Sequence, residues 1–135
     1  MALVQVRGGC TRRDANHEHF NAFWEKQLEA YNTHFGDISH ETIHLQILAT
    51  LPKYQRHGYA SLLCGWAVEV HYQGSSLQGI SVMASPMGYN LYAKLGFKEV
   101  GTFCIQIRGE REKLTLTAMM YRPDPARVSL EARAD

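Results

Sequence analysis

The sequence predicts an α/β domain organised around a parallel β-α-β unit, and the order of its periodic segments carries this prediction. Apolar and polar residues alternate over Thr42–Thr50, a helical pattern follows over Arg56–Gln73, and a second apolar strand comes at Gly79–Ala84. Two strands joined through a helix pair in parallel with a right-handed crossover. Further on, Glu99–Ile107 and Lys113–Tyr121 alternate on either side of a turn-like segment, which predicts an antiparallel hairpin.

The N-terminal part of the chain offers one strand and one helix. Leu3–Arg7 alternates and is followed by two glycines, so we expect a short strand there. Asp14 or Asn16 can cap a helix that runs to about Phe35, where Gly36 ends it. One stripe of this helix is apolar, which favours a place in the core over a ligand surface. Its members are Phe20, Phe23, Trp24, Leu28 and Tyr31.

The two later helices have clear end signals. The helix Arg56–Gln73 stops at Gly74, and the helix that ends at Gly96 has Ser85 as a possible N-cap, followed by a proline. Prolines and polar residues from Arg122 on predict a loose tail, so we expect one domain over residues 1–121, with its core over 42–121, and a flexible tail over 122–135. The helix Arg56–Gln73 also carries an apolar stripe, formed by Tyr59, Leu62, Leu63, Trp66, Ala67 and Val70.

Length, charge and cysteine content narrow the class of protein. The chain has 135 residues, enough for one domain with a real core. Its formal net charge is +1 without a lysine or arginine run, so a nucleic-acid surface is unsupported. Cys10, Cys64 and Cys104 are odd in number and widely spaced, which favours small buried hydrophobes in a reducing compartment. With no signal peptide and no run of about eighteen apolar residues, we expect a soluble intracellular protein without a membrane partner, cytoplasmic or nuclear.

The seven histidines raise the question of a metal site. His17 and His19 would point apart on a helix, while His40 and His44 straddle a loop and a strand. Neither spacing suits a metal centre, so we expect no metal.

The junction between the first strand and the following helix is suited to anionic oxygens. Gln55–Ser61 has the spacing Gln-x-x-Gly-x-Ala where the helical pattern begins. Main-chain N–H groups at a helix start lack intrahelical partners and lie at the positive end of the helix dipole. Gly58 would let the backbone approach a ligand, and Ala60 would leave room beside it. Taken alone, the motif suits an ordinary strand-to-helix turn equally well.

A second motif lies about thirty residues further along the chain, and the two motifs together are more specific than the first one alone. Ala84–Phe97 reads ASPMGYNLYAKLGF. In this order and separation, the two motifs resemble the GNAT superfamily of acyl-CoA-dependent N-acetyltransferases, in which a Gln/Arg-x-x-Gly-x-Gly/Ala loop precedes a helix ending in Leu-Tyr-x-Lys-x-Gly-Phe. Here that ending is Leu91–Phe97. The resemblance covers roughly residues 42–121 and implies acetyl-CoA as acyl donor. It also implies a mixed, mostly antiparallel sheet with a central parallel β-α-β unit between flanking helices, in three αβα layers.

The resemblance further implies which residues bind acetyl-CoA. The cofactor strand would splay from its neighbour at Leu48, Ala49 and Thr50, whose main chain would bond pantetheine. The Leu48 N–H would stabilise the oxyanion of the tetrahedral intermediate, and such a donor is typically worth about 3 kcal/mol. Ser85 stands where an asparagine is frequent in the family, so it either bonds the cofactor or only caps its helix. The phosphate loop would contribute Gln55, Arg56, His57, Gly58, Tyr59, Ala60 and Ser61.

Two side chains are candidates for the proton transfers. By the resemblance, Tyr92 would point at the cofactor sulfur, and a phenol with a pKa near ~10 can donate to a departing thiolate. Some members carry a glutamate eleven residues before the loop glutamine, where this chain has His44. An imidazole with a pKa near ~6.5 could accept the amine's proton, with Glu41 as a distant alternative and a water relay as another.

The main departure from the family lies at the N-terminus. Family members carry three strands and two helices before the cofactor strand, whereas Met1–Glu41 supplies about one of each, so the acceptor side looks shortened. We therefore hold two hypotheses: acetyl transfer to the amine of a small molecule or peptide, or a weak or inactive acyl-CoA-binding module. A regulatory protein that makes no use of its phosphate loop is a third. If Leu3–Arg7 pairs beside Thr42–Thr50, an exposed sheet edge would invite a homodimer.

Overall fold

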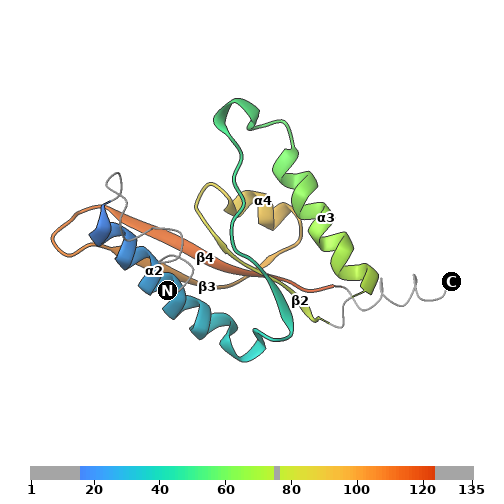
Figure 1. The fold of residues 1–135 in the computed structure, drawn as a ribbon, viewed down its shortest axis with the longest axis horizontal. Coiled ribbons are helices and arrows are strands. Elements are labelled where there is room, and N and C mark those ends of the chain that lie inside the picture. The colour runs from blue at the N-terminus through green and yellow to red at the C-terminus, as the bar shows by residue number, and fades with distance from the viewer. Residues whose placement is uncertain (1–15, 75–76, 124–135) are drawn as a thin grey trace.

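The computed structural model describes residues 16–74 and 77–123, which form a four-stranded mixed sheet in the order β1-β2-β4-β3 (Figure 1). β1 (Thr42–Leu45) and β2 (Gly79–Ala84) pair in parallel. β4 (Lys113–Tyr121) pairs antiparallel with both β2 and β3 (Lys98–Gln106). This is the predicted arrangement, a parallel β-α-β unit extended by an antiparallel hairpin.

Helices cover both faces of this sheet, so the domain has the predicted three layers (Figure 1). α2 (His17–Phe35) lies on one face, followed by the short 3₁₀ helix η2 (Gly36–Ile38). α3 (Tyr59–Gly74) and α4 (Tyr89–Lys94) lie on the other, and the 3₁₀ helix η3 (Pro52–Tyr54) precedes α3.

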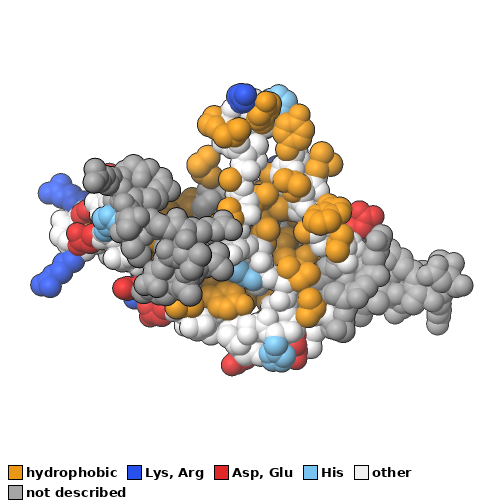
Figure 2. Space-filling model, viewed as in Figure 1, with side chains coloured by type: hydrophobic (Ala, Val, Ile, Leu, Met, Phe, Trp, Pro, Cys, Tyr) orange, Lys and Arg blue, Asp and Glu red, His pale blue; other side chains and the backbone are white. Residues whose placement is uncertain are grey.

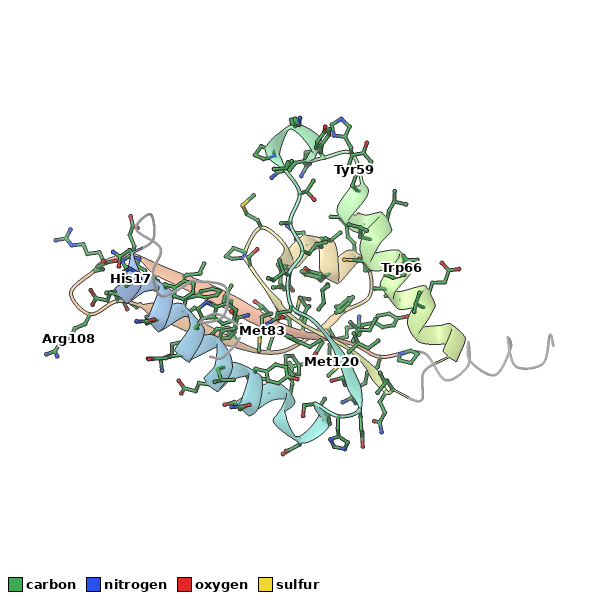
Figure 3. All side chains as sticks on the ribbon, in the orientation of Figure 1. His17, Tyr59, Trp66, Met83, Arg108 and Met120 are labelled. Carbon is green, nitrogen blue, oxygen red and sulfur yellow. The ribbon has the colours of Figure 1, made fainter. Side chains whose placement is uncertain are left out.

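The alternation along the strands divides the core into two clusters, one on each face. On the side of α3 and α4, Ile80, Val82 and Ala84 of β2 pack with residues of both helices. On the side of α2, Phe35 packs against Ala118 and Met120 of β4, with Met83 beside them. Figure 3 labels Met83 and Met120 where α2 passes over the sheet.

The start of α2 follows the sequence signal. The Asn16 side-chain oxygen accepts the N–H groups of Glu18 at 3.0 Å and His19 at 3.2 Å, so Asn16 is the N-cap. Asp14, the other candidate cap, lies outside the described residues, as do Cys10, the predicted strand Leu3–Arg7 and nearly all of the predicted tail.

Three predicted boundaries were wrong, each for a local reason. The strand Thr42–Thr50 ends at Leu45, because the chain leaves the sheet there. The helix Arg56–Gln73 begins only at Tyr59, because Arg56 has a φ of 67° and Gly58 a φ of 83°, neither of them helical. α4 begins at Tyr89 instead of after Ser85, since the residues between them form a turn.

The apolar stripes of the two long helices are less buried than their spacing suggests. On α2, Phe20, Phe23 and Trp24 are half-buried, and Leu28 is exposed. On α3, five of the six stripe residues are exposed, and among residues 59–70 the buried residue is Cys64. The expectation of buried cysteines is correct for Cys64 and wrong for Cys104, which is exposed.

Candidate active site

The candidate site lies where β1 and β2 part. Their pairing ends at Leu45 opposite Val82, and residues 46–50 continue without a ladder partner, while β2 runs on through Met83 to Ala84. Main-chain N–H and C=O groups along the separated segments are therefore open to a bound group. The separation places Leu48, Ala49 and Thr50 in the stretch that leaves the sheet.

The beginning of α3 faces the same opening. Gly58 is in the left-handed region, where a glycine is favoured, and no atom lies within 4 Å of a Cβ built on it. The Leu62 N–H donates to the Gly58 carbonyl at 3.0 Å, the first bond of the helix. The N–H groups of Tyr59, Ala60 and Ser61 thus precede the first intrahelical donor and are available to anionic oxygens at the positive end of a 16-residue helix.

Short-range hydrogen bonds hold the loop before α3. The Gln55 side-chain amide donates to the Thr50 carbonyl at 3.0 Å and so ties the two ends of the loop together. The Tyr54 N–H donates to the Leu51 carbonyl at 2.8 Å within η3. The His57 ring lies 2.7 Å from the Gln55 carbonyl through Nδ1 and stacks on Tyr59 with centroids 5.9 Å apart. Gln55 and His57 therefore support the loop through their side chains.

These elements enclose a cleft of about 760 Å³ between the separated segment, the start of α3, the end of β2 and α4. Arg56 and Lys94 bring positive charge to its wall, which suits a ligand carrying phosphates. Of the residues predicted to bind the cofactor, the cleft is lined by Leu48, Thr50, Gln55, Arg56, Gly58, Tyr59, Ala60, Ser61 and Ser85. Ala49 and His57 are not among its lining residues.

Tyr92 of α4 lies on the wall of this cleft although it is only 6% exposed. Its ring packs edge-on against Phe97 at 5.5 Å, and a Cβ on Gly88 would lie 3.2 Å from it, so glycine at that position leaves room for the ring. Burial, with a smaller contribution from the nearby Cys64 thiol, raises the pKa of Tyr92 to about 12. The phenol therefore stays protonated at neutral pH and remains a hydrogen-bond donor.

His44 lies on the opposite face of the sheet from Tyr92. Its Nδ1 is 2.9 Å from the hydroxyl of Ser81, its register partner on β2, which is fully buried. The rings of Tyr31 and Phe35 of α2 pack against the imidazole, with centroids 4.7 and 6.1 Å away. Burial lowers the pKa of His44, so the ring is neutral at neutral pH. His44 does not line the cleft, but it is one residue from the point where the strands part.

The sequence did not single out several residues of the cleft. Asn90 and Lys94 lie one turn apart on α4, and that i, i+4 spacing places them on the same side of the helix. Tyr54 lies in the cleft through η3, Val82 belongs to the last pair of β1 and β2, and Met83 follows where β2 extends beyond its partner. Ser85 has another role as well, since its hydroxyl accepts the Gly88 N–H at 3.1 Å in the turn before α4.

A second cleft, of about 630 Å³, lies between the first half of α2 and the β3–β4 hairpin. Phe20, Phe23 and Trp24 line it, so this part of the stripe faces a hollow as well as the core. His19 Nε2 and Glu110 Oε1, 2.8 Å apart, are hydrogen-bonded at its rim. The residues that form it are separate from those of the cleft at α3.

Residues 16–74 and 77–123 contain neither a cluster of metal ligands nor a membrane-spanning helix. No three His, Cys, Asp or Glu side chains gather there as metal ligands. None of the helices in that part of the chain combines the length and apolarity needed to cross a bilayer.

Comparison with known proteins shows the family of the chain. The model of the acetyltransferase (GNAT) domain matches residues 11–121. The chain therefore belongs to the GNAT acetyltransferase family. No curated protein matches it significantly.

Two solved structures, from Arabidopsis and Agrobacterium, show the same fold at low sequence identity. Arabidopsis thaliana NAA60 in complex with a bisubstrate analogue is similar with a TM-score of 0.52 and 16% identity, covering 60% of this chain and 48% of that one. A protein assigned as an acetyltransferase in Agrobacterium tumefaciens also has a TM-score of 0.52 and 16% identity, covering 83% and 96%. An acetyltransferase of the GNAT family from Streptococcus pneumoniae has a TM-score of 0.49 and 20% identity, covering 59% and 51%. The chain thus spans about half the length of the Arabidopsis and Streptococcus proteins.

Proposed function

We propose that this chain transfers an acetyl group from acetyl-CoA to a primary amine, which attacks the thioester directly. The observation that carries the proposal is the continuity of the cleft, which runs from the start of α3 along the separated segment to Tyr92. Such a shape fits a long ligand with phosphates at one end and a reactive thioester at the other.

The phosphate end has a matching set of groups. The N–H groups of Tyr59, Ala60 and Ser61 would donate hydrogen bonds to the pyrophosphate oxygens, with Arg56 and Lys94 adding positive charge. Gly58 leaves the approach open, because no atom lies near the position of its missing side chain. Pantetheine would then follow the main chain of Leu48–Thr50, beside the end of β2.

The chemical step needs a proton donor for the departing thiolate. Tyr92 fits this role, because its phenol is protonated and lies on the wall of the cleft. The Leu48 N–H would stabilise the negative charge that develops on the thioester oxygen.

The amine would reach the thioester from the face of α2, through the opening beyond Leu45. His44 stands at this opening as a neutral imidazole and could accept the amine's proton. It can do so through Nε2 only if its Nδ1–H donates to the Ser81 hydroxyl. In the other tautomer Nε2–H is a donor, and water would have to take the proton. Small polyamines, peptide N-termini and lysine side chains are all acceptors consistent with this route.

Titration with acetyl-CoA followed by an assay of CoA release tests the proposal. We expect saturable binding, and release of free CoA when the protein is given a panel of amines. Absence of binding would overturn the proposal.

Binding without release across the panel would favour the alternative, an acyl-CoA-binding module. The shape of the sheet gives that alternative some support, because in the described part of the chain no strand pairs with the outer edge of β1. The acceptor side of the domain is therefore open where the cofactor side is well formed.

A further inference from the structure

An apolar surface runs along α3, opposite the side of the helix that packs into the core. Cys64 and Val68 contact the core, and the exposed stripe lies on the other side of the helix. Leu62 is 70% exposed and Trp66 is 64% exposed. The space-filling view shows hydrophobic side chains gathered along α3 and the loop before it (Figure 2). We call this surface the α3 stripe; its residues are Tyr54, Tyr59, Leu62, Leu63, Trp66 and Val70.

The α3 stripe is continuous, and its helical part is almost free of charge, whereas the Lys53 ammonium lies 4.8 Å from the ring centroid of Tyr54. The rings of Tyr54 and Tyr59 are 6.5 Å apart, so the loop extends the surface of the helix. Figure 3 labels Tyr59 near the start of α3 and Trp66 further along it. Between residues 59 and 70 the sequence has a single charged residue, Glu69. A partner selected by charge complementarity would therefore find little to recognise.

The size of the α3 stripe is close to what one subunit contributes to a stable interface. Six large, roughly half-exposed side chains present on the order of 600 Å² of apolar surface, at the upper end of what monomers usually expose. A standard interface buries about 800 Å² per partner, which the flanking residues of the same helix would supply.

We propose that the α3 stripe is the interface of a homodimer in which two copies of α3 pack antiparallel about a two-fold axis. An isologous contact requires that the surface complement itself. A two-fold axis between Leu63 and Trp66 places Leu63 against Trp66 of the partner subunit, and Tyr59 against Val70 of the partner subunit. Large side chains then meet smaller ones between residues 59 and 70, and the two helix dipoles oppose each other. This interface is distinct from one made across the β1 edge.

Light scattering behind size exclusion, over a range of protein concentrations, tests the proposal on the full chain. We expect a species of twice the 15.3 kDa chain mass. Leu62→Glu should weaken the dimer on the order of 100-fold, because it buries unpaired carboxylates. Leu28→Glu is the matched control, since Leu28 is a leucine of similar exposure (56%) on α2 and should leave the dimer intact. A dimer that survives Leu62→Glu, or that both variants weaken equally, would overturn the proposal.

Fluorescence separates the remaining outcomes. In a Trp24→Phe background Trp66 is the only tryptophan, and its emission should shift to longer wavelength when dilution dissociates the dimer. A monomer at every concentration contradicts the proposal. If Trp66 is then shielded, the α3 stripe packs within its own chain; if it is exposed, the stripe serves a different protein.

Discussion

The two faces of the parallel pair β1–β2 carry different kinds of side chain at the point where the strands part. On the face of α3 and α4, Leu45 and Val82 belong to an apolar core that continues into the cleft and Tyr92. On the face of α2, their neighbours His44 and Ser81 form a hydrogen-bonded polar pair beneath aromatic rings. Adjacent residues of each strand point to opposite faces of the sheet. One face is therefore suited to a long acyl donor, and the other is suited to a proton acceptor.

This difference indicates that neither face alone carries all the groups that the proposed reaction needs. The α3–α4 face has a protonated phenol but, among its described residues, no neutral imidazole lines the cleft. The α2 face has the imidazole, but it lies across the sheet from the cleft. The two faces meet where the pairing of β1 and β2 ends, at Leu45 and Val82, so substitutions on the two faces should affect different steps.

The largest expected effect belongs to the cofactor face. Wild-type protein at ~100 times the dissociation constant of acetyl-CoA should gain about 2.7 kcal/mol of stability by mass action. Gly58→Glu should abolish this gain, because it places a carboxylate where the phosphates would bind. Thermal scans with and without acetyl-CoA measure both.

A control variant distinguishes the effect of the added charge at position 58 from the effect of backbone strain there. Gly58→Ala is also strained by the φ of 83°, but its methyl group meets open space. It should lower the free energy of unfolding by about 1–2 kcal/mol and keep most of the stabilisation by acetyl-CoA. Equal shifts in wild type and Gly58→Glu would show that acetyl-CoA does not use this loop.

An effect confined to turnover is expected at Tyr92. Tyr92→Phe keeps the ring and its contact with Phe97 but removes the proton donor, so turnover should fall ~10²-fold while the affinity for acetyl-CoA stays nearly unchanged. Tyr89→Phe, one turn earlier on α4, is the matched control and should keep normal turnover. CoA release measured beside a binding isotherm decides, and unchanged turnover in Tyr92→Phe would assign the proton to water.

Much of this architecture was accessible from the sequence because local signals and tertiary structure agree. β2 and β4 have the predicted bounds, and α2 begins at the predicted cap Asn16. The strand Thr42–Thr50 was predicted too long because its alternation continues past Leu45, while pairing depends on where the neighbouring strand lies. The left-handed backbone at Arg56 could not be foreseen, since arginine does not favour it.

The candidate site, like the fold, was predictable from the sequence only in part. A motif spacing located the loop at Gly58 and the ring of Tyr92, because both depend on local backbone geometry. It could not locate Lys94 or Tyr54, whose places in the cleft depend on how α4 and η3 are oriented. The stripe on α3 is a similar case: periodicity indicates which side of a helix is apolar, but it does not indicate what covers that side.

The smallest expected effect is a pH dependence of stability from the α2 face. Burial lowers the pKa of His44 below its ordinary value of 6.5 in the folded chain. The ring contacts Tyr31 and Phe35 of α2 and Ser81 of β2, and none of these carries a charge at neutral pH. As the pH falls below 6.5, the unfolded chain takes up the proton first, so folding stability decreases until the pH reaches the lower folded pKa.

His44→Gln should therefore lose less stability than wild type on acidification through this window, as denaturant titrations at several pH values would measure. His17→Gln, an exposed histidine at the start of α2, is the matched control and should follow the wild-type curve. Equal pH dependence in wild type and His44→Gln would mean that the His44 ring is not buried as the structure places it.

Assayed for CoA release, the same variant shows whether the imidazole takes the amine's proton: turnover reduced ~10²-fold identifies a base. Turnover close to wild type, with the pH dependence of stability still altered, assigns the proton to water and leaves His44 a packing residue of the α2 face.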